Sequence, residues 1–150
     1  MSQLNIQFIL KMLGLMFILE FLFVLVAVAV AMFYGGDDVY PLLQTGGIML
    51  VSGLVLYFIG FRANERAAGR REGMITVTLT WGLLSFLGML PFTLGGYISN
   101  PADAYFETMS GFTTTGATIL KDIEALPKGI LFWRSLIQWQ GGVGMIVFTV

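Results

Sequence analysis

The chain has 150 residues, of which 57% are hydrophobic and only 11% are charged, with a formal net charge of −1. Soluble proteins carry about 25% charged residues, so this composition indicates an integral membrane protein. The sequence has no cysteine and no histidine, which excludes disulfides, thiolate zinc sites and the common catalytic triads. The small net charge also provides no electrostatic field for nucleic acid. We therefore expect neither an enzyme nor a nucleic-acid-binding protein.

Four apolar stretches are long enough to cross a bilayer, which takes roughly 20 mostly apolar residues. They run from Met12 to Tyr34, from Val39 to Phe61, from Met74 to about Gly96, and from Gly129 to Val150. Pro91 is expected to kink or end the third stretch, because proline cannot donate a helical hydrogen bond. The sequence thus predicts an all-α, multi-pass protein surrounded by membrane lipid.

Orientation follows from the basic residues, because loops rich in Lys and Arg stay in the cytoplasm. Residues 62–72 contain four of the eight basic residues, whereas the turn with Asp37 and Asp38 contains none. We therefore expect the N-terminus and the 62–72 loop to be cytoplasmic. A cleaved signal peptide ending at Ala29-Val30-Ala31 is the alternative, but the apolar run before it is too long for one.

The connection between the third and fourth stretches contains a short helix. Asn100 is a good N-cap, Pro101 suits the first helical position, and Asp103 suits the positive end of the helix dipole. The helix is expected to end near Ser110, with Gly111 terminating it. At 1.5 Å per residue it is about 15 Å long, so it can enter a membrane without crossing it.

An uncharged, threonine-rich segment follows this short helix. Threonine favours extended backbone, and a glycine within the segment, Gly116, permits a positive φ. A helix that enters and an extended segment that returns form a re-entrant loop, whose carbonyl groups can replace the hydration shell of a cation. The alternative, equally compatible with the composition, is an extracellular turn that binds no ion.

The residues of this loop resemble a known family. The run Asp103-Ala104-Tyr105-Phe106-Glu107-Thr108-Met109-Ser110-Gly111-Phe112-Thr113-Thr114-Thr115-Gly116-Ala117-Thr118 is similar to the first pore loop of the Trk/Ktr/HKT cation transporter superfamily. The likeness continues from Leu126 to Trp139, into the helix that follows that loop. It also includes the glycine-bearing run Gly141-Gly142-Val143-Gly144-Met145.

The resemblance implies a fold of four helix/pore-loop/helix repeats in pseudo-fourfold symmetry around one pore. It further implies that this chain supplies one quarter of a selectivity filter for K⁺, the transported ion, with no bound cofactor. The filter residues would be Thr113, Thr114, Thr115, Gly116 and Ala117, with K⁺ held through the first four. Gly116 would be the signature glycine, and glycine there favours K⁺ over Na⁺.

The TrkH branch of the superfamily has two helices before its first repeat, which suggests three regions in this chain. Residues 1–61 would hold those two helices, residues 62–72 the cytoplasmic loop, and residues 73–150 the first repeat. Because the family has four repeats, we expect an N-terminal fragment that needs the remaining three. The resemblance also implies a homodimer, a cytosolic nucleotide-binding regulatory subunit, and a place in the cytoplasmic (inner) membrane.

Supporting residues are predicted around the loop. Asp103, Glu107, Gly111 and Arg134 are expected to support the short helix. We predict a structural ion pair between Glu107 and Arg134, with snorkelling of Arg134 to the interface as the alternative. The glycines Gly141, Gly142 and Gly144 would allow either a bend of the last helix or, as we prefer, close helix packing.

Three functions fit these observations. The first is K⁺ uptake by a TrkH-type pore subunit. The second is a small cation channel assembled from four copies of the chain, and the third is a membrane accessory protein that conducts nothing. Glu20, the only acid in the first stretch, is expected to be structural in each of them.

Overall fold

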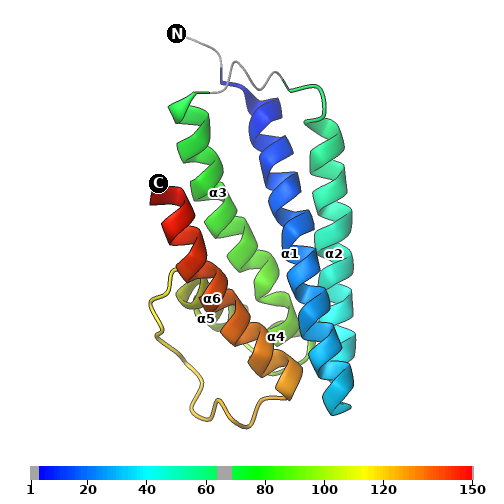
Figure 1. Cartoon of the computed structure of the whole chain (residues 1–150). Coiled ribbons are helices and arrows are strands. Elements are labelled where there is room, and N and C mark those ends of the chain that lie inside the picture. Colours follow the sequence, from blue (N-terminus) through cyan, green and yellow to red (C-terminus); the bar gives the residue numbers. More distant parts are fainter. Residues whose placement is uncertain (1–3, 64–68, 150) are drawn as a thin grey trace.

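The computed structural model of the chain describes residues 4–63 and 69–149, with side chains as far as residue 144. In these residues every regular element is a helix, which confirms the all-α fold class. The helices are α1 (Ile6–Tyr34), α2 (Val39–Ile59), α3 (Arg70–Gly88), α4 (Leu90–Leu94), α5 (Pro101–Phe112) and α6 (Lys128–Thr149). Figure 1 shows α1, α2 and α3 side by side, with α6 crossing obliquely and α5 behind it.

Three of the four predicted membrane spans are found in the described residues. The segments Ile6–Tyr34, Val39–Ile59 and Arg70–Leu94 are long and apolar enough to cross a bilayer. The fourth stretch forms the helix α6, which is not among the three segments found in the described residues. Part of the predicted 62–72 loop lies outside the described residues, and the loop is shorter than predicted because α3 already begins at Arg70.

Two helices start earlier than predicted because of side-chain caps. The Asn5 side chain accepts a hydrogen bond from the Phe8 backbone N–H at 3.1 Å, so α1 begins at Ile6 rather than near Met12. At the start of α3, Glu72 accepts a hydrogen bond from the Gly69 N–H at 3.0 Å. A carboxylate in the first turn of a helix satisfies a donor that has no partner within the helix.

The third span is interrupted just before Pro91, as predicted. α3 ends at Gly88 and α4 begins at Leu90, because the proline ring cannot be accommodated beside the carbonyl four residues earlier. The interruption leaves the Gly88 carbonyl free to accept a hydrogen bond from the indole N–H of the fully buried Trp133 at 3.1 Å. The break in the third span thereby fixes the position of α6.

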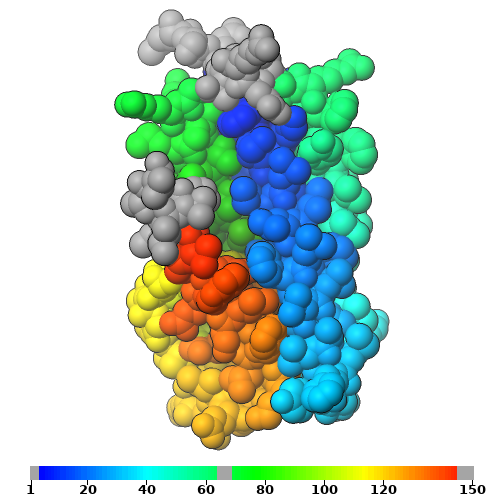
Figure 2. All heavy atoms as spheres, viewed as in Figure 1, coloured from blue at the N-terminus to red at the C-terminus, as the bar shows by residue number. Residues whose placement is uncertain are grey.

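The core lies where α6 packs between the first helices and α5. Its fully buried side chains include Leu42, Met49, Phe92, Ile130, Trp133 and Ile137. Figure 2 shows the atoms of α6, in orange and red, lying directly against those of α1, in blue. Helix α1 therefore supports the helix that carries Arg134.

The turn between α1 and α2 caps α6 through Asp38. This side chain is fully buried, and its Oδ2 accepts a hydrogen bond from the Ile130 N–H at 2.9 Å. Because α6 begins at Lys128, the carboxylate meets the positive end of that helix. An added Cβ on Gly129 would lie 2.5 Å from the same Oδ2, so the cap requires glycine there.

We expect Asp38→Ala to lower the free energy of unfolding by about 1 to 2 kcal/mol, because α6 loses its cap. Asp38→Asn should retain most of the stability, since the amide oxygen can still accept the hydrogen bond. The matched control is Asp37→Ala at the exposed neighbouring residue. Thermal unfolding in detergent measures the difference, and equal melting temperatures for the two alanine variants would contradict the cap.

Glu20 is buried, with 4% of its surface exposed, in keeping with the predicted structural role. It lines a cavity of about 290 Å³ between α1, α3 and α6 together with Gln140. Most other lining residues are apolar, among them Leu84, Phe112 and Val143. The carboxyl group thus faces the amide across the contact between α1 and α6.

Candidate functional site

The short helix α5 begins as predicted and ends later. The Asn100 side chain accepts a hydrogen bond from the Ala102 N–H at 3.1 Å, and Pro101 is the first helical residue. The helix continues to Phe112, so the prediction that Gly111 terminates it is wrong. An added Cβ on Gly111 would lie 3.0 Å from the Ile137 side chain. This glycine allows α5 to pack closely against α6. Sequence patterns within α5 could not indicate that contact, because Ile137 lies on another helix.

A left-handed residue ends α5. Thr114 has φ +56°, and its N–H donates to the Gly111 carbonyl at 2.9 Å. The N–H of Thr115 donates to the Ser110 carbonyl at 3.0 Å. These two hydrogen bonds form a Schellman motif, in which glycine is usual at the left-handed position. A β-branched residue there is strained, and such strain is found mostly at functional sites.

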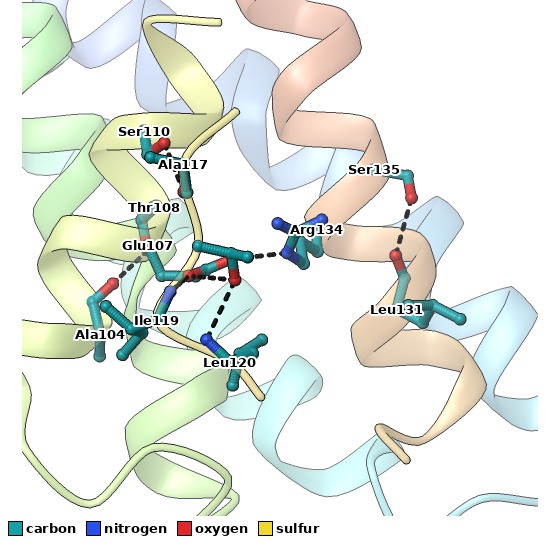
Figure 3. A network of polar contacts seen from close by, with 11 residues as sticks. Ala104, Glu107, Thr108, Ser110, Ala117, Ile119, Leu120, Leu131, Arg134 and Ser135 are labelled. Atoms are coloured by element: carbon teal, nitrogen blue, oxygen red, sulfur yellow. Dashed lines mark hydrogen bonds and ion pairs between the residues drawn. The ribbon is translucent and has the colours of Figure 1, made fainter. Parts of the chain in front are cut away.

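Residues 113–120, which we name the return segment, run back beside α5. The chain leaves the end of α5 and proceeds to the end of the bundle at which α6 begins (Figure 1). The Ser110 hydroxyl donates to the Ala117 carbonyl at 2.7 Å and ties the segment to α5 (Figure 3). Gly116 has φ +74°, the conformation for which the sequence analysis expected glycine.

Glu107 connects α5, the return segment and α6. Its side chain is fully buried, and Oε1 lies 2.6 Å from Nε of Arg134. The hydroxyl of Thr118 donates to the carboxylate at 2.9 Å, and the Ile119 N–H donates to Oε2 at 3.0 Å (Figure 3). The predicted ion pair is confirmed, and Glu107 also accepts two hydrogen bonds that the sequence did not indicate.

Asp103, the other acid predicted to support the short helix, does not contribute to this network. Asp103 lies exposed in the first turn of α5, where a negative charge stabilises the helix. Among the described residues no hydrogen bond or ion pair joins it to the return segment. The structure thus brings Glu107 and Arg134 together at the segment and leaves Asp103 at the far end of α5.

The carbonyl groups of the return segment fall into two kinds. The Thr113 carbonyl accepts from the Thr114 hydroxyl at 2.7 Å, and the Ala117 carbonyl accepts from Ser110. Within the described part of the chain no hydrogen bond reaches the carbonyls of the three residues between them. Those residues, Thr114, Thr115 and Gly116, are exposed. These three consecutive residues, which we call the row of free carbonyls, thus retain carbonyl oxygens as available acceptors, the hard ligands that alkali cations require.

The glycines of α6 serve helix packing at one position. An added Cβ on Gly141 would lie 2.8 Å from the Phe112 carbonyl carbon and 3.0 Å from the Gly111 oxygen. Gly142 has more room, since its nearest neighbour would be a Thr114 methyl group at 3.9 Å. Gly144 lines the cavity beside Glu20. α6 is helical through all three glycines. The described helix therefore shows the packing contact at Gly141 and no interruption at the glycines.

Several residues that hold the return segment and α6 in place could not be recognised from the sequence. Ser110 and Thr118 act on residues that are near only after the chain reverses, and Asp38 acts on a helix many residues away. The one available signal was the run of hydroxyl residues on both sides of Gly116. Hydroxyls frequently bond to nearby backbone and to carboxylates, without their partner being evident from spacing.

The chain is similar to cation transport proteins over most of its length. Residues 43–150 match the protein family TrkH, described as a cation transport protein. The chain is 36% identical to the Trk system potassium uptake protein TrkH of Vibrio parahaemolyticus over 146 residues, which cover 95% of this chain and 29% of that protein. It is 35% identical to an uncharacterized cation transporter of Methanocaldococcus jannaschii, covering 97% of this chain and 30% of the relative.

A solved structure agrees with the sequence matches. The crystal structure of the potassium transporter TrkH from Vibrio parahaemolyticus superimposes with a TM-score of 0.89 at 34% identity, over 96% of this chain and 31% of that one. The chain therefore spans about 30% of the length of the relatives it matches. The fold and the arrangement of the helices are shared with a membrane transporter.

Proposed function

Since this chain belongs to the TrkH family of cation transport proteins, we propose that it forms part of the ion-conducting subunit of a potassium uptake system. In this proposal the return segment supplies one quarter of a selectivity filter, built from Thr113, Thr114, Thr115, Gly116 and Ala117. Three further repeats complete the pore. K⁺ is the transported ion, and the subunit carries out no covalent chemistry.

The observation that carries the proposal is the row of free carbonyl groups beside Gly116. Thr114, Thr115 and Gly116 are exposed residues whose carbonyls accept no hydrogen bond within the described part of the chain, while the two carbonyls flanking them are hydrogen-bonded. A cation can thus be dehydrated by the central carbonyls alone. The end of α5 adds the negative pole of its helix dipole near the same place.

The network around Glu107 supports a filter because it holds the backbone of the return segment without placing an unpaired charge beside the carbonyls of residues 114–116. Its negative charge is paired with Arg134 and its oxygens are occupied by Thr118 and Ile119. A free carboxylate beside the row would favour divalent ions and slow the release of a bound cation. The charge is instead used to fix the return segment.

The same proposal covers location, partners and domain organisation. Residues 1–61 form two extra helices, and residues 73–150 form the first repeat. The N-terminus and the basic loop face the cytoplasm, because basic loops are retained there. We further propose the inner membrane as the location, a homodimer of the subunit and a cytosolic nucleotide-binding regulator. Relatives called Trk system proteins support the multi-component assembly.

The test replaces Gly116 with serine in the transporter that contains this chain. At φ +74° any side chain strains the backbone by about 1 to 2 kcal/mol, and it alters the adjacent carbonyls. We expect the preference for K⁺ over Na⁺ to fall by about tenfold or more, equivalent to about 1.4 kcal/mol. Ion fluxes into reconstituted vesicles measure the ratio.

The matched control is Gly96→Ser. Gly96 has φ +71° and lies outside the return segment, so the same strain should leave the K⁺/Na⁺ preference unchanged. A Gly116→Ser transporter with the parental preference would contradict the filter. A Gly96→Ser transporter with an equal loss would show that strain alone, wherever it lies, produces the effect.

A further inference from the structure

The cavity between α1, α3 and α6 contains an acid that the proposed filter does not use. Glu20, the middle residue of α1, faces the cavity from one side and Gln140 faces it from α6. Most of the remaining lining is apolar or aromatic, and the Thr80 hydroxyl already donates to the Thr76 carbonyl at 2.8 Å. No lysine, arginine, tyrosine or second acid is among the described residues that line the cavity. The carboxyl group therefore has no counter-charge there.

The polar atoms of Glu20 and Gln140 are buried and incompletely hydrogen-bonded. The two side chains lie close enough to interact with each other. Three of their buried atoms, Oε1 of Glu20 and both Oε1 and Nε2 of Gln140, nevertheless have no hydrogen-bond partner among the described residues. Buried polar atoms without partners are rare, because each has lost its hydrogen bonds to water. The nearest remedy is a direct pair between the two side chains.

Donors and acceptors balance in such a pair for one form of Glu20. An ionised carboxylate can only accept hydrogen bonds, so it could pair with the amide N–H but would leave the amide oxygen without a donor. A protonated carboxyl group has one donor and one acceptor, which match the amide oxygen and the amide N–H of Gln140. An unpaired charge in an apolar cavity at the middle of a membrane span is also strongly disfavoured.

We propose that Glu20 is a proton-binding site within the membrane, where its neutral carboxyl group pairs with the amide of Gln140 through two hydrogen bonds. The carboxyl O–H donates to Oε1 of the amide, and Nε2 donates to the carboxyl C=O. Without the proton, the cavity would contain an uncompensated charge and an amide oxygen with no donor. The contact between α1 and α6, the helix that carries Arg134, therefore depends on a bound proton.

Infrared spectra of the transporter that contains this chain, recorded in detergent at neutral pH, test the protonation. A protonated carboxyl group has a C=O stretching band separate from the bands of a carboxylate. We expect an acid band in the parent that Glu20→Gln removes and that Gln140→Leu shifts, because leucine fills similar space without an amide. If Gln140→Leu is not recovered from the membrane, Gln140→Met replaces it. The matched control is Glu124→Gln at an exposed acid, which should leave the acid band unchanged.

Thermal unfolding of the same variants tests the pair. Glu20→Gln should melt near the parent, because two amides can exchange the same two hydrogen bonds. Glu20→Leu and Gln140→Leu each leave one buried polar partner alone and should lower the melting temperature, whereas the double variant removes both partners and should recover much of the loss.

Three outcomes would overturn the inference: loss of a carboxylate band in place of an acid band in Glu20→Gln, an acid band that the substitution of Gln140 leaves unmoved, or strictly additive losses in the leucine variants. Neither readout measures ion selectivity. The proton site and the filter tested by Gly116→Ser can therefore fail independently of each other.

Discussion

Glu107→Gln is expected to eliminate K⁺ uptake and to destabilise the protein by about 3 to 5 kcal/mol, the cost of removing one partner of a buried ion pair. The Glu107 side chain is fully buried, and the Arg134 side chain is only 17% exposed. The substitution leaves the guanidinium without a counter-charge. It also leaves a single amide oxygen to accept the hydrogen bonds that Thr118 and Ile119 donate to two carboxylate oxygens.

Arg134→Gln should be similarly harmful, and the double variant Glu107→Gln with Arg134→Gln should lose less than the sum of the two. Residues in direct contact show interaction energies of about 0.5 to 3 kcal/mol in such cycles. Thermal unfolding in detergent and K⁺ uptake by a host without other uptake systems measure both effects. Strictly additive losses would contradict the coupling.

Exchanging the two charges is not expected to restore function. An arginine at residue 107 would present donors to the Thr118 hydroxyl and the Ile119 N–H, and that N–H needs an acceptor. The matched control is Glu124→Gln, at an exposed acid of the loop before α6, which should behave as the parent. Equal losses in Glu107→Gln and Glu124→Gln would show that net charge, and not the buried network, matters.

Gly141→Ala is expected to have the second largest effect. The added Cβ would clash with the Phe112 carbonyl oxygen and would lie 2.8 Å from its carbonyl carbon and 3.0 Å from the Gly111 oxygen. Backbone atoms cannot turn away as a side chain can. α5 and α6 must separate, at a cost of about 1 to 3 kcal/mol for overpacking. Because the return segment begins at the end of α5, we also expect K⁺ uptake to fall to near the background.

The neighbouring glycine provides the control for this prediction. Gly142→Ala places its Cβ 3.9 Å from the nearest atom, which is an ordinary contact, so stability and uptake should remain near those of the parent. Melting temperatures in detergent compare the two alanine variants directly. If Gly142→Ala is as harmful as Gly141→Ala, flexibility of the glycine run, and not packing at one position, is the property that counts.

Local features were predictable because each depends on residues close together in the chain. The low share of charged residues and the long apolar runs indicated membrane helices, and the pair Asn100-Pro101 correctly started α5. Gly116 was predicted to take a positive φ because glycine alone does so freely. The pairing of Glu107 with Arg134 was the one distant contact predicted, since two opposite charges near a membrane have few other partners.

The tertiary structure decided the contacts between segments that meet only after folding. Gly111 was expected to end a helix, but its neighbour Ile137 on α6 makes it a packing residue, and Thr114 ends the helix instead. Likewise, the capping of α6 by Asp38 depends on how the turn between α1 and α2 is placed against α6. Sequence patterns report the preferences of one segment, whereas such contacts depend on distances between segments, which only packing determines.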